Sequence, residues 1–182
     1  MASEIIVNTI KAPTTGANAN KVIIPSGVTL DASAGTLRPS AGAVVQTVMF
    51  EDSTMQVSTS TSFATFFSQS ITPKYADSKL LCTVNIHGTA YEGSTAYQGA
   101  RYRMHCNEGG SDFDFRNKEV YFFHYPTGSY YGGGLGMHLF VDARSTNAHE
   151  FRVEGAVYNS YTSRLMNRNN EYSTMIIQEI AQ

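Results

Sequence analysis

Charge is scarce in this 182-residue sequence. Only 15% of its residues are charged, against about 25% in a typical globular domain. The net charge is −2, because 13 Lys and Arg face 15 Asp and Glu. Proteins bind phosphate backbones through an excess of Lys and Arg, so this balance argues against a nucleic-acid partner.

Long hydrophobic runs and cysteines are also scarce. No stretch approaches the roughly 18 to 20 apolar residues that span a bilayer, so we expect no membrane insertion. The opening MASEIIVN lacks the basic and apolar regions of a secretory signal, and we expect no signal peptide. The two cysteines, Cys82 and Cys106, both fall on the apolar phase of alternating runs. We predict buried thiols, with a disulfide between two core strands as the alternative.

Aromatic residues are absent from the first 49 positions, although the chain holds 11 tyrosines and 10 phenylalanines. Closely spaced Pro and Gly argue against a helix in residues 1–41. Ordering these residues costs roughly 40–80 kcal/mol, which their few apolar side chains cannot offset alone. We therefore predict an extended N-terminal arm over 1–41, ordered by sister subunits or by a larger assembly. Its docking or inter-subunit residues are predicted to be Ile5, Ile6, Val7, Ile10, Val22, Ile23, Ile24, Val28 and Leu30.

Residues 42–182 alternate between apolar and polar side chains in many short runs, which is typical of half-buried strands. The clearest run puts Leu80, Cys82, Val84 and Ile86 on one face. An earlier run groups Val44, Gln46, Val48 and Phe50. Similar runs lie within 99–106, 135–142 and 151–158. About eight or nine such strands predict an all-β fold over 42–182, an antiparallel β-sandwich that is jelly-roll-like.

Tyrosine and arginine gather in the predicted loops of this domain. Loop tyrosines beside Gly, Ser and Asn give a large rigid contact area with a polar tip, which suits surface recognition. The alternative is that they lie at a subunit interface or cap the core. The candidate recognition residues are Tyr91, Tyr97, Tyr130, Tyr131, Arg164 and Arg168.

Catalytic and metal-binding patterns are weak. The five histidines form no H-x-H or H-E-x-x-H motif, so we interpret them as ordinary surface or pocket residues. A metal site that joins one histidine from each of three chains is the alternative. Asp112 and Asp114 would lie about 7 Å apart on one strand face, a spacing that overlaps inverting glycosidases. A solvated strand face explains them equally well, so we predict no catalytic residue, no metal and no cofactor.

Four parts of the sequence stand out together: Ser3-Glu4-Ile5 with Val7-Asn8 and Ile10, then Gly42 to Phe50, then Ser70 to Lys74 with Ser78 to Leu81, and finally Ser173 to Ala181. In this order they resemble the N-terminal anchor, the linker, the core motif "SITPK…SSKIL" and the last strand of bacteriophage tail-fibre-like virion proteins, common in phages of aquatic bacteria. The middle of the chain, 92–170, matches in general β character.

The resemblance implies a virion structural protein without a cofactor, usually homotrimeric, with an N-terminal virion-binding part. A length of 182 residues leaves no room for a fibre shaft. We therefore expect a non-enzymatic capsid decoration (cement) protein on the outer surface of a phage particle. Its arm would dock on the major capsid protein or on a tail or adaptor protein. The alternatives are a short tail fibre or spike adhesin that binds host-surface glycan, and a carbohydrate-binding or carbohydrate-active jelly-roll module.

Overall fold

The computed structural model describes residues 14–15, 39–91, 98–109, 111–114, 120–124, 132–157, 163–166 and 172–182. The chain divides into two compact units, Met1–Arg38 and Pro39–Gln182. Apart from Thr14 and Thr15, the first unit lies outside the described residues. The arm residues predicted from Ile5 to Leu30 therefore lie outside them as well.

The second unit is built from strands, and no helix occurs in its described ranges. Eleven strands are present there, more than the eight or nine expected, because short strands such as Gln56–Ser58, Ser111–Asp114 and Ser163–Met166 gave no clear alternation. The strands are β1 (Val44–Asp52), β2 (Gln56–Ser58), β3 (Ala64–Ile71), β4 (Lys79–Tyr91), β5 (Gln98–Glu108), β6 (Ser111–Asp114), β7 (Val120–His124), β8 (Gly132–Asp142), β9 (His149–Val157), β10 (Ser163–Met166) and β11 (Ser173–Ile180).

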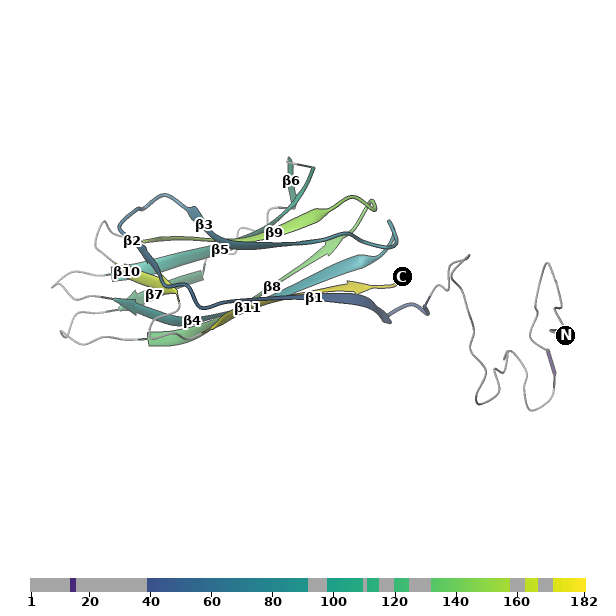
Figure 1. The fold of residues 1–182 in the computed structure, drawn as a ribbon, viewed down its shortest axis with the longest axis horizontal. Coiled ribbons are helices and arrows are strands. Elements are labelled where there is room, and N and C mark those ends of the chain that lie inside the picture. Colours follow the sequence, from purple (N-terminus) through teal and green to yellow (C-terminus); the bar gives the residue numbers. More distant parts are fainter. Residues whose placement is uncertain are drawn as a thin grey trace, which may run out of the picture. The chain divides into compact units, whose positions relative to one another are not determined.

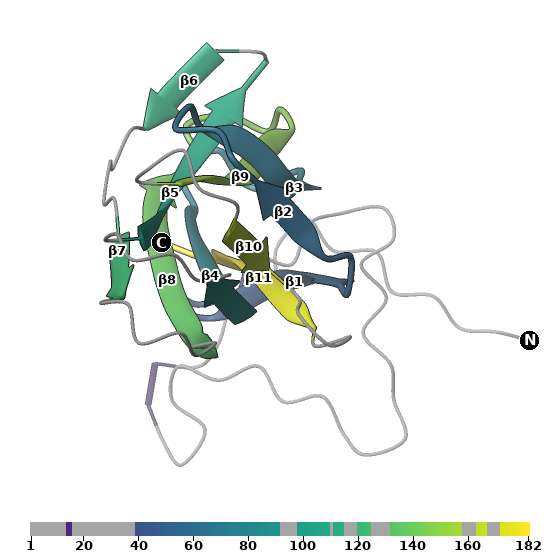
Figure 2. The same cartoon turned by 90° about the vertical axis from the view of Figure 1, so that its left-hand side faces the viewer.

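These strands form two antiparallel sheets that lie one above the other (Figures 1 and 2). The first sheet has the order β1-β11-β4-β10-β2, with β8 also paired to β4. The second has the order β3-β9-β5-β6, with β7 also paired to β5. The pairs β1 with β11, β3 with β9, β4 with β8 and β5 with β7 are nested like a long hairpin rolled onto itself. Such nesting is the jelly-roll arrangement, so the predicted fold is confirmed.

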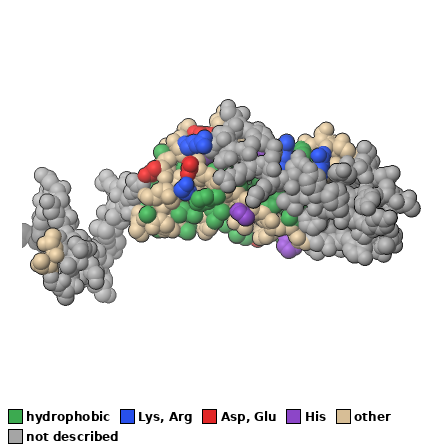
Figure 3. Space-filling view, turned by 180° about the vertical axis from the view of Figure 1, so that it is seen from behind, with side chains coloured by type: hydrophobic (Ala, Val, Ile, Leu, Met, Phe, Trp, Pro, Cys, Tyr) green, Lys and Arg blue, Asp and Glu red, His purple; other side chains and the backbone are tan. Residues whose placement is uncertain are grey.

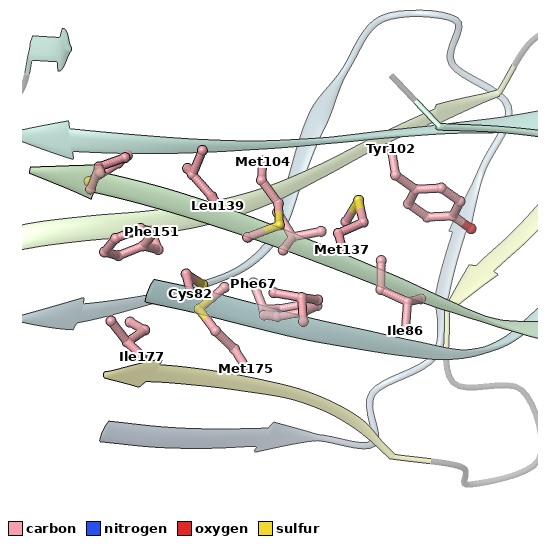
Figure 4. Packing of buried hydrophobic residues seen from close by; sticks show 14 of the residues in the cluster. Phe67, Cys82, Ile86, Tyr102, Met104, Met137, Leu139, Phe151, Met175 and Ile177 are labelled. Atoms are coloured by element: carbon pink, nitrogen blue, oxygen red, sulfur yellow. The ribbon is translucent and has the colours of Figure 1, made fainter. Parts of the chain in front are cut away.

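The core lies between the two sheets, where the apolar phases of their strands meet (Figure 4). The first sheet contributes Cys82, Ile86 and Ile177, and the second contributes Tyr102 and Phe151, all fully buried. The predicted inward phase of β4 is therefore correct. Cys82 and Cys106 are both buried and no disulfide joins them, which confirms the predicted thiols.

The strand β1 departs from the predicted alternation at its start. Its register shifts between Val44 and Gln46, so Val45 is an extra residue in the ladder. Val44 consequently pairs with Ile180 and is 52% exposed, whereas Val48 and Phe50 pack against the core. The prediction that Val44 shares a face with Val48 and Phe50 is wrong, because a β-bulge reverses the side chains that precede it.

Candidate interaction surfaces

One buried carboxylate joins three segments that are distant in the sequence. Glu179 on β11 is fully buried. Its two oxygens accept hydrogen bonds from Gln46 Nε2 on β1 at 2.7 Å, from the backbone N–H of Lys74 at 2.9 Å and of Tyr75 at 3.0 Å, and from Ser78 Oγ at 2.8 Å. Glu179 therefore fixes the loop between β3 and β4 against the edge of the first sheet.

The donors around Glu179 also determine its ionisation. Burial alone would raise the pKa of this carboxyl, but the backbone N–H of Lys74, the hydroxyl of Ser78 and the other donors outweigh burial and lower the pKa. Since both oxygens already have protein donors, Glu179 is a structural carboxylate. Sequence analysis did not single it out, although its position on the apolar phase of Ser173–Ile180 was a usable signal.

The outward side of the first sheet is a second feature that sequence analysis missed. We call it the first-sheet outer face. Its residues form four rows across β1, β11, β4 and β8: Val44, Ile180, Lys79 and Asp142; Thr47, Gln178, Leu81 and Phe140; Met49, Ile176, Thr83 and His138; Glu51, Thr174, Asn85 and Gly136.

This face carries a few exposed apolar side chains among polar ones. Met49 is 56% exposed and Phe140 is 39% exposed. Lys79 and Asp142 form an ion pair of 2.8 Å, and Glu51 is the only other charged residue in these rows. Figure 3 shows hydrophobic side chains exposed between charged ones and histidines on one side of the molecule. Six of the sixteen residues in these rows are apolar and nine are polar or charged, so the face is a mixed outward surface with few charges.

The second sheet follows the common pattern, and its outward residues pair with one another. Arg103 Nε donates to Glu154 Oε2, and His105 Nε2 lies 2.9 Å from the same oxygen. Arg152 donates to Glu150 at 2.6 Å. Burial would raise the pKa of Glu154, but its hydrogen bonds to His105 and Arg103 lower it.

An aromatic ring extends this charged cluster. The guanidinium of Arg103 lies 4.2 Å from the centre of the Phe63 ring, and that of Arg101 lies 4.9 Å from it. Arg101 also donates to the carbonyl of Thr61. These contacts hold the arginines against the strand surface, so the described outward residues of β5 and β9 form a charged and largely self-paired cluster.

The histidines only partly match their predicted surface setting. His87 and His138 are exposed, as expected, but His105 and His149 are buried. The ring of His149 lies 2.8 Å from the carbonyl of Asn147 and 2.6 Å from that of Ala143, so it fastens the β8–β9 connection. Within the described ranges, no group of three or more His, Cys, Asp or Glu could hold a metal ion.

The predicted recognition residues are only partly covered by the structure. Tyr97, Tyr130, Tyr131 and Arg168 lie outside the described residues. Tyr91 ends β4 opposite Ser163 of β10, and the next residue of β10, Arg164, lies opposite Ala90. The register therefore brings the backbones of Tyr91 and Arg164 to neighbouring positions, and the side chains of both lie outside the described part of the chain.

The aspartate pair of the carbohydrate-active alternative falls on β6. Asp114 pairs with Cys106 and Asp112 with Asn107, and the register shifts between these two pairs. The regular ladder that would hold both carboxylates on one face is thus interrupted between them.

No helix in the described part of the chain is long and apolar enough to cross a membrane.

No protein-family model matches this chain, and no curated protein matches its sequence. The structure itself defines the class: an antiparallel jelly-roll β-sandwich.

Proposed function

We propose that this chain is a non-enzymatic bacteriophage virion protein, a homotrimeric capsid decoration protein on the outer surface of the particle. Its N-terminal arm docks on the particle and its sandwich projects outward. The arm's target is the major capsid protein or a tail or adaptor protein.

The observation that carries this proposal is where the family-like stretches lie. Gly42 to Phe50 forms most of β1, and Ser173 to Ala181 forms β11. Ser70 to Lys74 ends β3 and enters the following loop, and Ser78 to Leu81 begins β4. In space β1, β11 and β4 are adjacent strands, and Glu179, which belongs to the last of these stretches, accepts hydrogen bonds from the other two. The opening stretch lies outside the described residues, and the other family-like stretches are joined in one part of the sandwich, which supports a shared architecture.

The fold is compatible with this proposal, but it is equally compatible with other functions. Jelly rolls occur in viral capsid proteins and also in lectins, so function has to be argued from residues. The stretch from 92 to 170 resembles the family least. It supplies β5, β6, β7 and β9, which are four of the five strands of the second sheet, and also β8 and β10 of the first sheet. We infer that the first sheet is the common scaffold and that the second sheet carries what is particular to this protein.

A short tail fibre or spike adhesin is the second candidate function. The observation that favours it is the register between β4 and β10, which brings the backbones of two predicted recognition residues, Tyr91 and Arg164, to neighbouring positions in the first sheet. On this hypothesis the protein binds host-surface glycan.

Heat resistance of the particle tests the first candidate. Phage particles assembled without this protein should lose infectivity at a lower temperature than complete particles, and adding purified protein should restore the difference. Equal heat resistance with and without the protein would exclude a decoration role. Binding of the purified protein to host cells, competed by host glycan, would then support the adhesin.

A further inference from the structure

We propose that His149 is held as a buried imidazolium and that, with Glu108 as its counter-charge, it forms a pH-sensitive latch on the β8–β9 connection, residues 143–148. The latch is closed while both groups are charged and opens when the imidazole loses a proton. This device is independent of the proposed virion role, because all of its groups belong to one end of one sandwich.

His149 stands at that end of the sandwich. It begins β9 on the inward phase that continues with Phe151 and Val153, and its side chain is fully buried. The register places it opposite Ile71, the last residue of β3, and opposite Glu108, the last residue of β5. Of these two cross-strand neighbours only Glu108 carries a charge, so the buried ring has one ionisable residue directly opposite it.

The two ring nitrogens of His149 both face carbonyl oxygens. Nδ1 lies 2.8 Å from the carbonyl of Asn147, and Nε2 lies 2.6 Å from the carbonyl of Ala143. Carbonyl oxygens accept hydrogen bonds and cannot donate them, whereas a neutral imidazole has one N–H and one lone pair. In the neutral form, one contact would bring a lone pair against a lone pair. Both contacts are hydrogen bonds only when the ring is an imidazolium, which donates at each nitrogen.

Glu108 supplies the counter-charge that a buried cation needs. Its Oε2 lies 4.0 Å from His149 Nε2. Its Oε1 accepts hydrogen bonds from Ser145 Oγ and from Asn147 Nδ2, the latter at 3.1 Å. These two bonds lower the pKa of Glu108 most, burial opposes them, and the positive charges of His149 and Arg144 lower it further. An ionised Glu108 therefore neutralises the ring and also binds the connection directly.

The connection held by these bonds contains a strained residue. Arg144 has a φ of 62°, in the left-handed region that residues with a Cβ rarely occupy. His149 bonds to the carbonyls of Ala143 and Asn147, near the two ends of the connection, and so fixes the segment that contains Arg144. Once the ring donates to only one of these carbonyls, this segment should be the first part of the β8–β9 connection to open.

The other charged side chains near the latch are accounted for along each neighbouring element. Asp142, at the end of β8, pairs with Lys79 at 2.8 Å. Glu150, which follows His149 on β9, pairs with Arg152 at 2.6 Å.

Two more charged residues flank the point where the connection meets the first sheet. There the backbone N–H of Ala143 donates to the carbonyl of Ser78 at 2.9 Å. Asp77 precedes Ser78, and Arg144, whose side chain is exposed, follows Ala143. Glu108 is thus the carboxylate whose contact with the buried ring the geometry defines.

The closed latch has an acid limit and an alkaline limit. Because the pKa of Glu108 is lowered in the folded protein, its contribution is present above its ordinary value of 4.5 and is lost as the pH falls through the lowered value. The contribution of a protonated His149 has the opposite sign, since it is present at low pH and is lost as the pH rises and the proton leaves. The connection should therefore open on the alkaline side through His149 and on the strongly acid side through Glu108.

Ring-nitrogen NMR of the 15N-histidine-labelled full chain tests the protonation state. His138 is exposed on β8 and is the internal reference. At a pH at which His138 is mostly neutral, His149 should still show protons on both ring nitrogens. Glu108→Gln should move the proton equilibrium of His149 about tenfold toward the neutral form, whereas Glu51→Gln, an exposed carboxylate on β1, should leave it unchanged. A neutral His149 at that pH in the wild type would overturn the assignment.

Amide hydrogen exchange of the same full chain tests the opening. After correction for the intrinsic exchange rate, protection of the Ser145 and Asn147 amides should fall by up to about tenfold per pH unit over the range in which His149 titrates. The Val84 amide in the centre of β4 should not follow this profile. His149→Gln should remove the pH step, and His138→Gln should keep it. A wild-type connection whose protection shows no step where His149 loses its proton would overturn the latch, even with His149 protonated.

Discussion

Replacing Glu179 by Gln should weaken the sandwich more than any single change of an exposed carboxylate. The wild-type carboxylate offers only acceptors to Gln46, Lys74, Tyr75 and Ser78. A glutamine amide keeps one acceptor oxygen and presents an NH2 group at the other position. If that NH2 faces Gln46 Nε2, two donors meet. Gln46 cannot simply rotate its amide, because the same Nε2 also donates to Thr72 O at 2.7 Å.

The magnitude follows from the number and type of bonds. A hydrogen bond to a charged group contributes about 1.5–3 kcal/mol, and an orphaned buried donor costs about 1–3 kcal/mol. With one donor orphaned and the remaining bonds no longer charge-assisted, Glu179→Gln should lower the free energy of unfolding by about 2–4 kcal/mol at pH 7. A typical domain has about 5–15 kcal/mol in total, so the loss is large.

The pH dependence of this difference has a definite sign. The pKa of Glu179 is lowered in the folded protein, so its ionised form stabilises the fold above the unfolded-state value near 4.5. That contribution disappears as the pH falls through the lower folded-state pKa. Other carboxylates with lowered pKa values, such as Glu150 and Glu154, are present in both proteins and cancel in the comparison.

Urea unfolding of wild type and Glu179→Gln at pH 7 and at pH 3 measures both effects. The difference should be about 2–4 kcal/mol at pH 7 and should shrink at pH 3. Glu51→Gln, an exposed carboxylate on β1, is the control and should change stability by less than about 0.5 kcal/mol. A difference below about 0.5 kcal/mol at pH 7, or one that does not depend on pH, would refute the role assigned to Glu179.

Two further predictions concern the core. Gly155→Ala should destabilise the fold by about 1–3 kcal/mol, because its new Cβ would lie 2.1 Å from the Phe66 ring, and the loss should be much smaller in a Phe66→Ala background. Additive losses in thermal melts of the four proteins would contradict that contact. The thiols of Cys82 and Cys106 should not react with a thiol reagent at pH 8 until the protein unfolds, because both are fully buried and burial raises the pKa of Cys82. Two equivalents of rapid reaction in the native state would show that the core is open.

Much of the fold could be predicted because period-2 alternation is a local property. The inward phase of β4 is readable from residues that follow one another, and so is that of β9, where Phe151 and Val153 are buried. The bulge at Val45 could not be predicted in this way, since it depends on how β1 meets β11. The sequence pattern placed His105 on a polar strand face. In the structure His105 is buried beside Glu154, a residue far away in the sequence, and a local pattern cannot show such a contact.

The interaction surfaces were harder to predict than the core. The outer face of the first sheet combines residues from four strands, and each strand alone shows only one or two apolar residues on its polar phase, such as Met49 on β1 or Phe140 on β8. Only the register aligns these residues into rows. Glu179 was within reach of sequence analysis, because an acidic residue on an inward phase requires buried donors.

The location of the protein on the particle tests the central claim most directly. Immunogold labelling of intact phage with antibodies against this chain should place gold over the whole head surface, as expected of a homotrimeric decoration protein. Label confined to the tail tip would contradict the decoration role and favour the adhesin, and particles that carry no label would contradict a place in the virion altogether.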